Sequence, residues 1–400
     1  MLLSCSTNGI ARARALPPYV NPHAGDTIGS VRQMYDGALS PALAITTFRN
    51  IDRLFPTRTV AHGSTPYPLA ASTMPLLDLT FTASGMPRTL SEYVELNRVS
   101  GLLVLKNGRI ALERYAYGNG PRTRWMSMSV AKSITSTLVG AAIRDGAIGS
   151  LSDPVTRYVP RLAGSAYDGV TVRNVLMMSS GVRWNETYTD PRSDRRRLLE
   201  AQIAQRPGAA VELMRTLPRA VPPGTANNYS TGETQIAGEV VRGAVGKSLS
   251  EYLSEKIWRP FGMETDASWW LDSPDGHEIG GSGFSATLRD YGRFGLFVLN
   301  DGVINGESIL PPGWIHDATT PKTLVGGAAL QYGYMWWPSA AAPGSVNDGA
   351  FSADGIFGQY IYINPREHVV IVQWSAQTKP KGGEAVNHEE FFAAVTEALR

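Results

Sequence analysis

Cysteine is nearly absent from this chain, as are the usual marks of metal-bound, membrane-spanning and nucleic-acid-binding proteins. Cys5 is the only cysteine, which excludes a disulfide framework and a cysteine-based metal site. The six histidines are scattered, and none has the HExxH spacing of a zinc hydrolase. No apolar run reaches the roughly 18 residues that a membrane span needs. The net charge of +2 gives no reason to expect a nucleic-acid partner.

What the chain does have is the composition of a globular protein. It contains 400 residues, of which 43% are hydrophobic and 18% charged, enough to bury a large core. The N-terminal MLLSCSTNG resembles the tail of a lipoprotein signal ending at Cys5, but no charged or usefully long apolar stretch precedes it. We therefore expect a cytoplasmic protein, and keep a periplasmic or lipid-anchored one as the alternative. The basic run Arg195 to Arg197 is interpreted as a solvated face.

The order of the periodic segments predicts an α+β fold. Residues 1–89, rich in Pro, Gly and Thr, are expected to form an arm that wraps a main domain at 90–400. Helical patterns are found at 90–99, 170–182, 236–245, 249–258, 288–299 and 391–399, and hairpin patterns at 101–117 and 360–374. Strands from both ends should form one antiparallel sheet flanked by helices, with residues 130–300 as a helical lobe. A catalytic cleft is expected where sheet and lobe meet.

A serine and a lysine three residues apart, Ser129 and Lys132, stand at the entry to a helical run that ends at Gly146. Residues with this spacing share one side of a helix, so the amine of Lys132 can reach the hydroxyl of Ser129. The pattern is typical of a nucleophile with its base. Ser129 would also lie in the first helical turn, where free backbone N–H groups favour developing negative charge.

The spacing alone is a weak signal. The alternative is that Ser129 caps the helix while Lys132 reaches the surface. Against this alternative, Lys132 is the only charged residue between Val130 and Ile143. A lysine in such a run is expected to be partly desolvated, which lowers its pKa toward that of a usable base.

Several spaced motifs resemble the serine hydrolases of the β-lactamase and penicillin-binding fold. They are MSVAKS, LSDPVTRYVPRL, the helix ending SSG, RPFGM and GGSGFSATLRDYGRFG. The nearest resemblance is to the 6-aminohexanoate-dimer hydrolase group, alongside class C β-lactamases and family VIII esterases. The resemblance implies that Ser129 is the nucleophile and Lys132 its base. Tyr229, in the sequence Tyr-Ser-Thr, would be the tyrosine of the second motif, which relays a proton to the leaving group; a core aromatic is the alternative.

The third motif departs from the β-lactamase pattern. Where β-lactamases carry a cation, Thr and Gly on an edge strand, the matching stretch here reads Ala353, Asp354, Gly355 and Ile356. An aspartate there would repel the carboxylate of a β-lactam. The resemblance to the dimer hydrolases, whose strand reads GIxGQ, implies that the N–H groups of Ile356 and Ser129 form the oxyanion hole. Gly355 would permit close backbone approach, with a simple strand kink as the alternative.

Two aromatic residues complete the predicted site. The polar, Arg-rich insertion between Trp184 and Pro223 is interpreted as a lid, and by resemblance its Tyr188 closes over the substrate amide. The alternative for Tyr188 is an exposed loop residue. Trp336 and Trp337 match a pair of tryptophans in the group, and Trp336 is assigned to the acyl pocket with core packing as the alternative.

The predicted function is hydrolysis of linear amides, short-chain esters or both through an acyl-enzyme, with no metal and no cofactor. The partner is a small-molecule substrate, and the oligomeric state is left open, including a homodimer. One rival is a penicillin-binding protein that is acylated by β-lactams with weak or no turnover. A second rival, an α/β-hydrolase, is discounted because the chain lacks a GxSxG nucleophile elbow.

Overall fold

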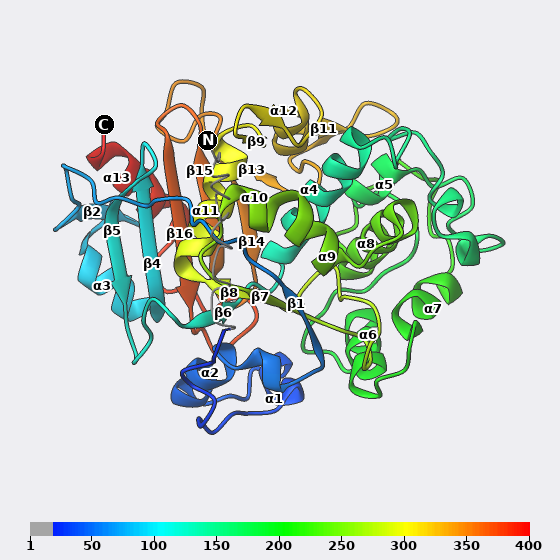
Figure 1. The fold of residues 1–400 in the computed structure, drawn as a ribbon, viewed down its shortest axis with the longest axis horizontal. Helices are drawn as coiled ribbons and strands as arrows, with labels where there is room; N and C mark the ends of the chain where they lie inside the picture. Colours follow the sequence, from blue (N-terminus) through cyan, green and yellow to red (C-terminus); the bar gives the residue numbers. More distant parts are fainter. Residues whose placement is uncertain (1–18) are drawn as a thin grey trace, which may run out of the picture.

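The structure is a computed structural model that describes residues 19–400. Cys5 and the signal-like segment around it lie outside the described residues. In Figure 1 a large sheet fills one side of the molecule, a helical lobe fills the other, and the N-terminal helices lie below the two. None of the described helices combines the length and the apolar character that crossing a bilayer requires. The predicted arrangement of sheet and helical lobe is confirmed.

The main sheet is antiparallel and has six strands in the order β13, β14, β15, β16, β4 and β5. Their bounds are β4 Val99–Lys106, β5 Arg109–Tyr115, β13 Trp337–Pro338, β14 Phe351–Gly355, β15 Gln359–Asn364 and β16 Val369–Ser375. Both predicted hairpins form, and β4 pairs with β16 so that Val104 lies opposite Ile371. The two ends of the chain therefore build one sheet.

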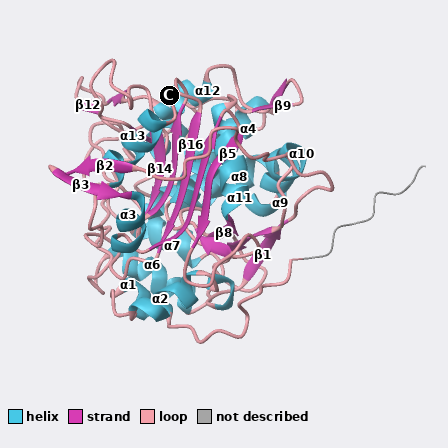
Figure 2. Cartoon of the chain, turned by 90° about the vertical axis from the view of Figure 1, so that its left-hand side faces the viewer, coloured by secondary structure: helices cyan, strands magenta, loops and turns pink. Residues whose placement is uncertain are grey.

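Strand β4 is buried on both faces because helices cover each side of the sheet. Leu103 and Leu105 face the main core with the helical lobe, whereas Leu102 and Val104 face a second apolar cluster. The second cluster is formed with α3 (Leu90–Leu96) and α13 (His388–Ala398). Figure 2 shows these two helices on one side of the strands and α11 (Leu288–Leu299) on the other. Such two-sided cover explains why β4 reads as a continuous apolar run.

The helical lobe is built around α4 (Val130–Arg144) and α8 (Thr231–Val245), which pack against each other. Its other elements are the single turns Val155–Arg157 and Pro160–Leu162, α5 Val172–Leu176, α6 Asp194–Ile203, α7 Ala209–Thr216, α9 Leu249–Leu253, a π-helical turn Ser254–Trp258 and α10 Arg259–Phe261. The helix predicted at 288–299 is confirmed as α11. The one predicted at 170–182 is wrong in length, because the α-helix ends at Leu176.

The described part of the N-terminal segment forms more structure than its weak periodicity indicated. It holds α1 Val31–Tyr35, α2 Pro41–Phe48, a turn at Ile51–Arg53, β1 Thr57–Val60 and the hairpin β2 Thr80–Ala83 with β3 Met86–Thr89. The hydroxyls of Ser30 and Ser40 cap α1 and α2. Strand β1 joins a second sheet in the order β1, β7 (Ala267–Trp270), β8 (Phe284–Thr287) and β6 (Arg124–Met126). This sheet leads directly into Ser129.

The remaining short elements lie between α11 and β13. They are β9 Val303–Ile304, β10 Glu307–Ser308, α12 Trp314–Thr319, β11 Lys322–Thr323 and β12 Ala329–Leu330.

Candidate active site

Ser129 occupies the turn between β6 and α4. Its backbone has helical angles (φ −71°, ψ −6°), and its side chain makes no capping hydrogen bond. Met128 directly before it has a φ of +44°, in the left-handed region that non-glycine residues seldom adopt. The hydroxyl of Ser129 is therefore free for another partner, and the alternative of a capping serine is wrong.

Lys132 lies one turn further along α4 and is fully buried, so the alternative of a surface lysine is also wrong. Its Nζ lies 2.8 Å from the Ser129 Oγ, 3.0 Å from the Thr231 Oγ1 and 2.9 Å from the Gly281 carbonyl oxygen. Burial lowers the pKa of the amine to about 7, which the negative charge of Glu186 partly opposes. A neutral Lys132 can donate to Thr231 and Gly281 and still take a proton from Ser129.

Tyr229 stands two residues before α8, next to the serine and the lysine. Its ring centroid lies 5.3 Å from the Nζ of Lys132, and the ring stacks on Trp337 at 5.7 Å. Burial raises the pKa of the phenol, while a hydrogen bond with Ser129 acts in the opposite direction. The neutral phenol is thus favoured, as a proton donor requires.

Gly355 and Ile356 bring the end of β14 against the Ser129 turn. A Cβ on Gly355 would lie 2.5 Å from the carbonyl oxygen of Ser127 and 3.2 Å from the nitrogen of Ser129, so the close approach requires glycine. Among the described residues, neither the Ser129 N–H nor the Ile356 N–H donates a hydrogen bond within the protein. Two unpaired N–H groups at such a junction are what an oxyanion hole needs.

Gln359 holds the turn that follows Ile356. Its side-chain amide donates to the carbonyl oxygens of Phe357 at 3.0 Å and Ser375 at 2.8 Å, and its oxygen accepts from the Trp125 indole at 2.8 Å. Phe357 adopts a φ of +68° in this turn. The buried amide therefore fixes the backbone that presents the Ile356 N–H.

A cavity of about 350 Å³ opens at these groups. Its lining includes Ser129, Tyr188, Tyr229, Trp337, Asp354, Gly355 and Ile356. Tyr188 is only 7% exposed, which argues against a free loop tyrosine. Trp336 does not line this cavity. It is fully buried and packs edge-on against Phe351, while its neighbour Trp337 forms the wall.

Glu186 is a residue of the site that sequence reasoning missed. Its carboxylate accepts from the Thr231 N–H at 2.9 Å and from the Thr231 hydroxyl at 2.5 Å, and the Trp184 indole also donates to it. Because Thr231 in turn accepts from Lys132, the acid is linked to the base through one hydroxyl. The WNETY segment carries no pattern that would have singled it out.

The basic run in α6 is not a solvated face, and that interpretation is corrected. Arg195 and Arg196 are each 4% exposed, and only Arg197 points to solvent. Arg195 donates to the phenol of Tyr35 in α1, whose ring lies 6.4 Å from that of Tyr188. Arg196 donates to Asp36 at 2.6 Å and to the carbonyl oxygen of Tyr188 at 3.2 Å. The two arginines thus fasten the insertion that carries Tyr188 to the N-terminal segment.

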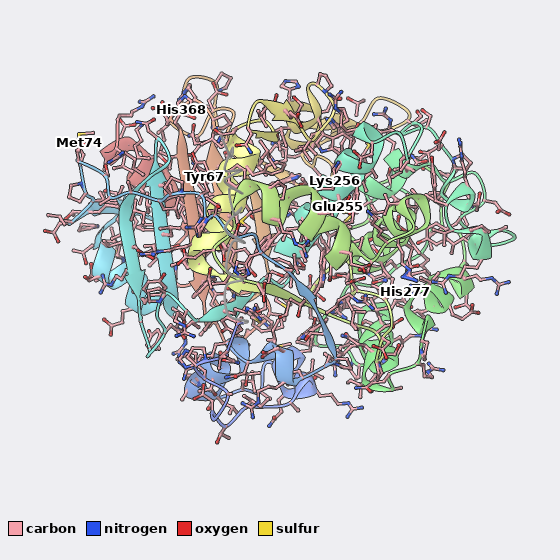
Figure 3. The ribbon with its side chains drawn as sticks, viewed as in Figure 1. Tyr67, Met74, Glu255, Lys256, His277 and His368 are labelled. Carbon is pink, nitrogen blue, oxygen red and sulfur yellow. The ribbon has the colours of Figure 1, made fainter. Side chains whose placement is uncertain are left out.

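Residues 19–400 contain no group of three or more His, Cys, Asp and Glu side chains placed to hold a metal ion. The histidines are spread over the molecule, and Figure 3 shows His277 on the helical lobe and His368 at the upper end of the sheet. His277 pairs with Glu239 at 2.7 Å, away from the Ser129 cavity. None of the residues that line the cavity is a histidine, so the base nearest to Ser129 is the lysine.

The family model described as Beta-lactamase matches residues 87–394, more than three quarters of the chain. The chain belongs to the beta-lactamase family. The 6-aminohexanoate-dimer hydrolase of Paenarthrobacter ureafaciens is 31% identical over 353 residues, covering 83% of this chain and 85% of that protein. The resemblance expected from the motifs is confirmed.

Solved structures agree on the fold. A candidate 6-aminohexanoate-dimer hydrolase from Bacillus anthracis matches with a TM-score of 0.77 and 23% identity, covering 94% of this chain and 98% of that one. A family VIII carboxylesterase matches with a TM-score of 0.56 and 17% identity over 75% of this chain and 92% of that one. The protein is therefore a beta-lactamase-fold serine hydrolase related to the dimer hydrolase, and an acyl-enzyme mechanism is typical of its family.

Proposed function

We propose that this protein hydrolyses linear amides and short-chain esters through an acyl-enzyme formed on Ser129. The observation that carries the proposal is the 2.8 Å contact between the Ser129 hydroxyl and the buried amine of Lys132, whose pKa is lowered to about 7. A desolvated lysine with such a pKa holds a substantial neutral fraction at neutral pH. It can therefore serve as the base that activates the serine.

In the acylation step, the Ser129 oxygen attacks the substrate carbonyl carbon while its proton passes to Lys132. The oxyanion receives hydrogen bonds from the N–H groups of Ser129 and Ile356. The phenol of Tyr229 then gives its proton to the departing nitrogen or oxygen as the bond to the acyl carbon breaks. Lys132 returns a proton to the phenolate oxygen, which leaves the acyl-enzyme and a neutral amine.

In the deacylation step, a water molecule replaces the leaving group. Its proton passes to Lys132 through Tyr229 while its oxygen attacks the acyl carbon. Ser129 is then expelled as the leaving group and regains a proton from Lys132. These steps need no metal and no cofactor, and the partner is a small-molecule substrate.

The linear 6-aminohexanoate dimer is the first amide to test, since the 31% identical relative is named for its hydrolysis. Tyr188 in the cavity wall supports amide cleavage, because a phenol over the scissile amide can donate to it. We expect Tyr188→Phe to lose amide hydrolysis while ester hydrolysis persists, because an alkoxide needs less protonation to leave than an amine. No cleavage of the dimer by the unmodified enzyme would remove this substrate from consideration.

The reaction is tested by Ser129→Ala with Ser133→Ala as its matched control. Ser133 lies four residues further along the same helix and donates only to the Met335 carbonyl oxygen, at 2.7 Å. We expect Ser129→Ala to abolish turnover of p-nitrophenyl acetate and labelling by a fluorophosphonate, and Ser133→Ala to retain both. Intact-protein mass spectrometry with peptide mapping locates the adduct. Labelling at another serine would refute the assignment.

A penicillin-binding role is the second candidate. Asp354 lines the Ser129 cavity, in the stretch that the resemblance matches to the carboxylate-binding strand of β-lactamases, so a β-lactam would meet an acidic side chain there and no cation. We expect no stable adduct with a labelled penicillin. Formation of one would favour the acylated, non-hydrolysing alternative.

A further inference from the structure

Asp354 places a carboxylate in the wall of the Ser129 cavity that forms no ion pair with the described residues. It precedes Gly355 on β14 and lines the cavity with Ser129. Its Oδ1 is shielded from solvent and has no hydrogen-bond partner among the described residues. No Lys, Arg or His of residues 19–400 forms an ion pair with it. Burial raises the pKa of this carboxyl, and the charge of His388 partly opposes the rise.

The other charged side chains of the cavity are either paired within the protein or placed at its boundary with a second hollow. Glu384 also lines it but is paired with His388 at 2.8 Å. Lys381 stands where the cavity adjoins a second hollow of about 640 Å³, and its Nζ lies 5.6 Å from the ring centroid of Tyr188. The second hollow is not lined by Asp354. The unpaired carboxylate therefore belongs to the compartment that also contains the nucleophile.

We propose that Asp354 binds a protonated amine of the substrate, so that the preferred amides and esters carry an ammonium group in the part that occupies this cavity. The proposal rests on the proposed function. Asp354 is half-buried in the cavity wall. A carboxylate held there is stabilised by an opposite charge, which an ammonium supplies together with N–H donors. A neutral chain of the same shape would leave the carboxylate unpaired, and a carboxylate-bearing chain would be repelled.

Two pairs of isosteric esters test the inference. The acyl pair is p-nitrophenyl 6-aminohexanoate and p-nitrophenyl heptanoate, which differ by an ammonium in place of a methyl group. The leaving-group pair is 2-(dimethylamino)ethyl acetate, whose amine is protonated at neutral pH, and 3-methylbutyl acetate, followed by proton release. In at least one pair we expect the kcat/KM of the cationic ester to exceed that of the neutral ester by about tenfold to a hundredfold, the usual range for a hydrogen bond to a charged group.

The variant Asp354→Asn should reduce this ratio toward one. The ratio is read on both members of a pair with the same sample, so partial misfolding does not change it. Glu384→Gln is the control acid in the same cavity and should retain most of the preference. Asp354→Lys should reverse it, so that p-nitrophenyl hydrogen adipate becomes a better substrate than the aminohexanoate ester.

Two results would overturn the proposal: equal kcat/KM values within both pairs for the unmodified enzyme, or an unchanged ratio in Asp354→Asn. Either is distinguishable from failure of the proposed function. Turnover of the neutral heptanoate that is lost in Ser129→Ala supports the hydrolase irrespective of charge preference. Absence of turnover for all four esters would refute the hydrolase, and the Asp354 inference with it.

Discussion

Replacing Glu186 by glutamine should move the pH dependence of the enzyme. Glu186 and Lys132 are joined through the Thr231 hydroxyl by hydrogen bonds of 2.5 and 3.0 Å, which places the two charges within about 6 Å. At that separation and an effective dielectric constant of about 20, their attraction is about 3 kcal/mol, or about two pKa units. The negative charge raises the pKa of Lys132, so its removal lowers that pKa.

The assay is the pH profile of kcat/KM with p-nitrophenyl acetate. Lys132 must be neutral to act as the base, so activity in the unmodified enzyme should rise with pH through about 7. In Glu186→Gln the rise should occur about two pH units lower, because the attraction that raises the pKa of Lys132 is lost. The plateau should also fall, because the Gln side chain presents an NH₂ group where the carboxylate accepts hydrogen bonds at both oxygens.

Glu233→Gln is the matched control for this experiment. Glu233 is a buried acid on α8, the helix that begins at Thr231. Its carboxylate accepts hydrogen bonds from Tyr167 and Ser180 rather than from Thr231. Its replacement should leave the acid limb of the profile in place. If the acid limb of the kcat/KM profile of Glu186→Gln stays near pH 7 or moves to higher pH, then either Glu186 does not act on Lys132 or Lys132 is not the titrating base.

Three further predictions concern stability and site geometry. Burial raises the pKa of Glu233 from 4.5 to about 7, so the carboxyl is ionised in the unfolded chain at a pH where the folded chain keeps it protonated. Its contribution to the free energy of unfolding therefore falls by up to about 3 kcal/mol as the pH rises from 4.5 to 7. Glu233→Gln should raise the urea midpoint at pH 8 but not at pH 4.5. Equal shifts of the urea midpoint at the two pH values would contradict this. Gly355→Ala should lower kcat/KM by about a hundredfold or more by displacing the oxyanion turn. Gly295→Ala is its control: its Cβ would lie 2.5 Å from Val370 of β16, so it should lower the melting temperature and leave the kcat of the folded enzyme unchanged. Arg196→Ala should raise KM for amides more than for esters, because it releases the backbone of Tyr188; an equal change for both substrates would mean that the arginine is merely structural.

The parts of the fold that could be predicted from the sequence are those fixed by local pattern. The helix at 288–299 begins at a capping threonine and has a strong apolar face, and the first hairpin turns at Asn107 and Gly108, both with positive φ. The contact of Ser129 with Lys132 is allowed by their helical spacing, and the absence of other charges between Val130 and Ile143 favoured a buried amine. In each case the decisive interactions join residues that are near in sequence.

The parts that could not be predicted depend on contacts between distant segments. The sequence did not distinguish Trp336 from Trp337, because neighbours in an extended segment point to opposite sides and the pattern does not say which side holds the cavity. Arg195 and Arg196 have the composition of a surface run, yet they are buried because Tyr35 and Asp36, some 160 residues earlier, supply their partners. Glu186 is reached only through Thr231, on a helix far along the chain.

These distant contacts give the N-terminal segment a definite place in the site. Helix α1 lies before residue 87, where the family match begins, yet its Tyr35 packs near Tyr188 and accepts from Arg195. Arg195 lowers the pKa of Lys132 and Glu186 raises it, so two oppositely charged groups of the insertion act on the same amine. Helix α1 contacts the insertion that carries both charged groups and Tyr188, so the N-terminal segment helps to hold them beside the cavity. The N-terminal segment, which the composition describes only as an arm, therefore contacts the insertion that forms part of the wall of the Ser129 cavity.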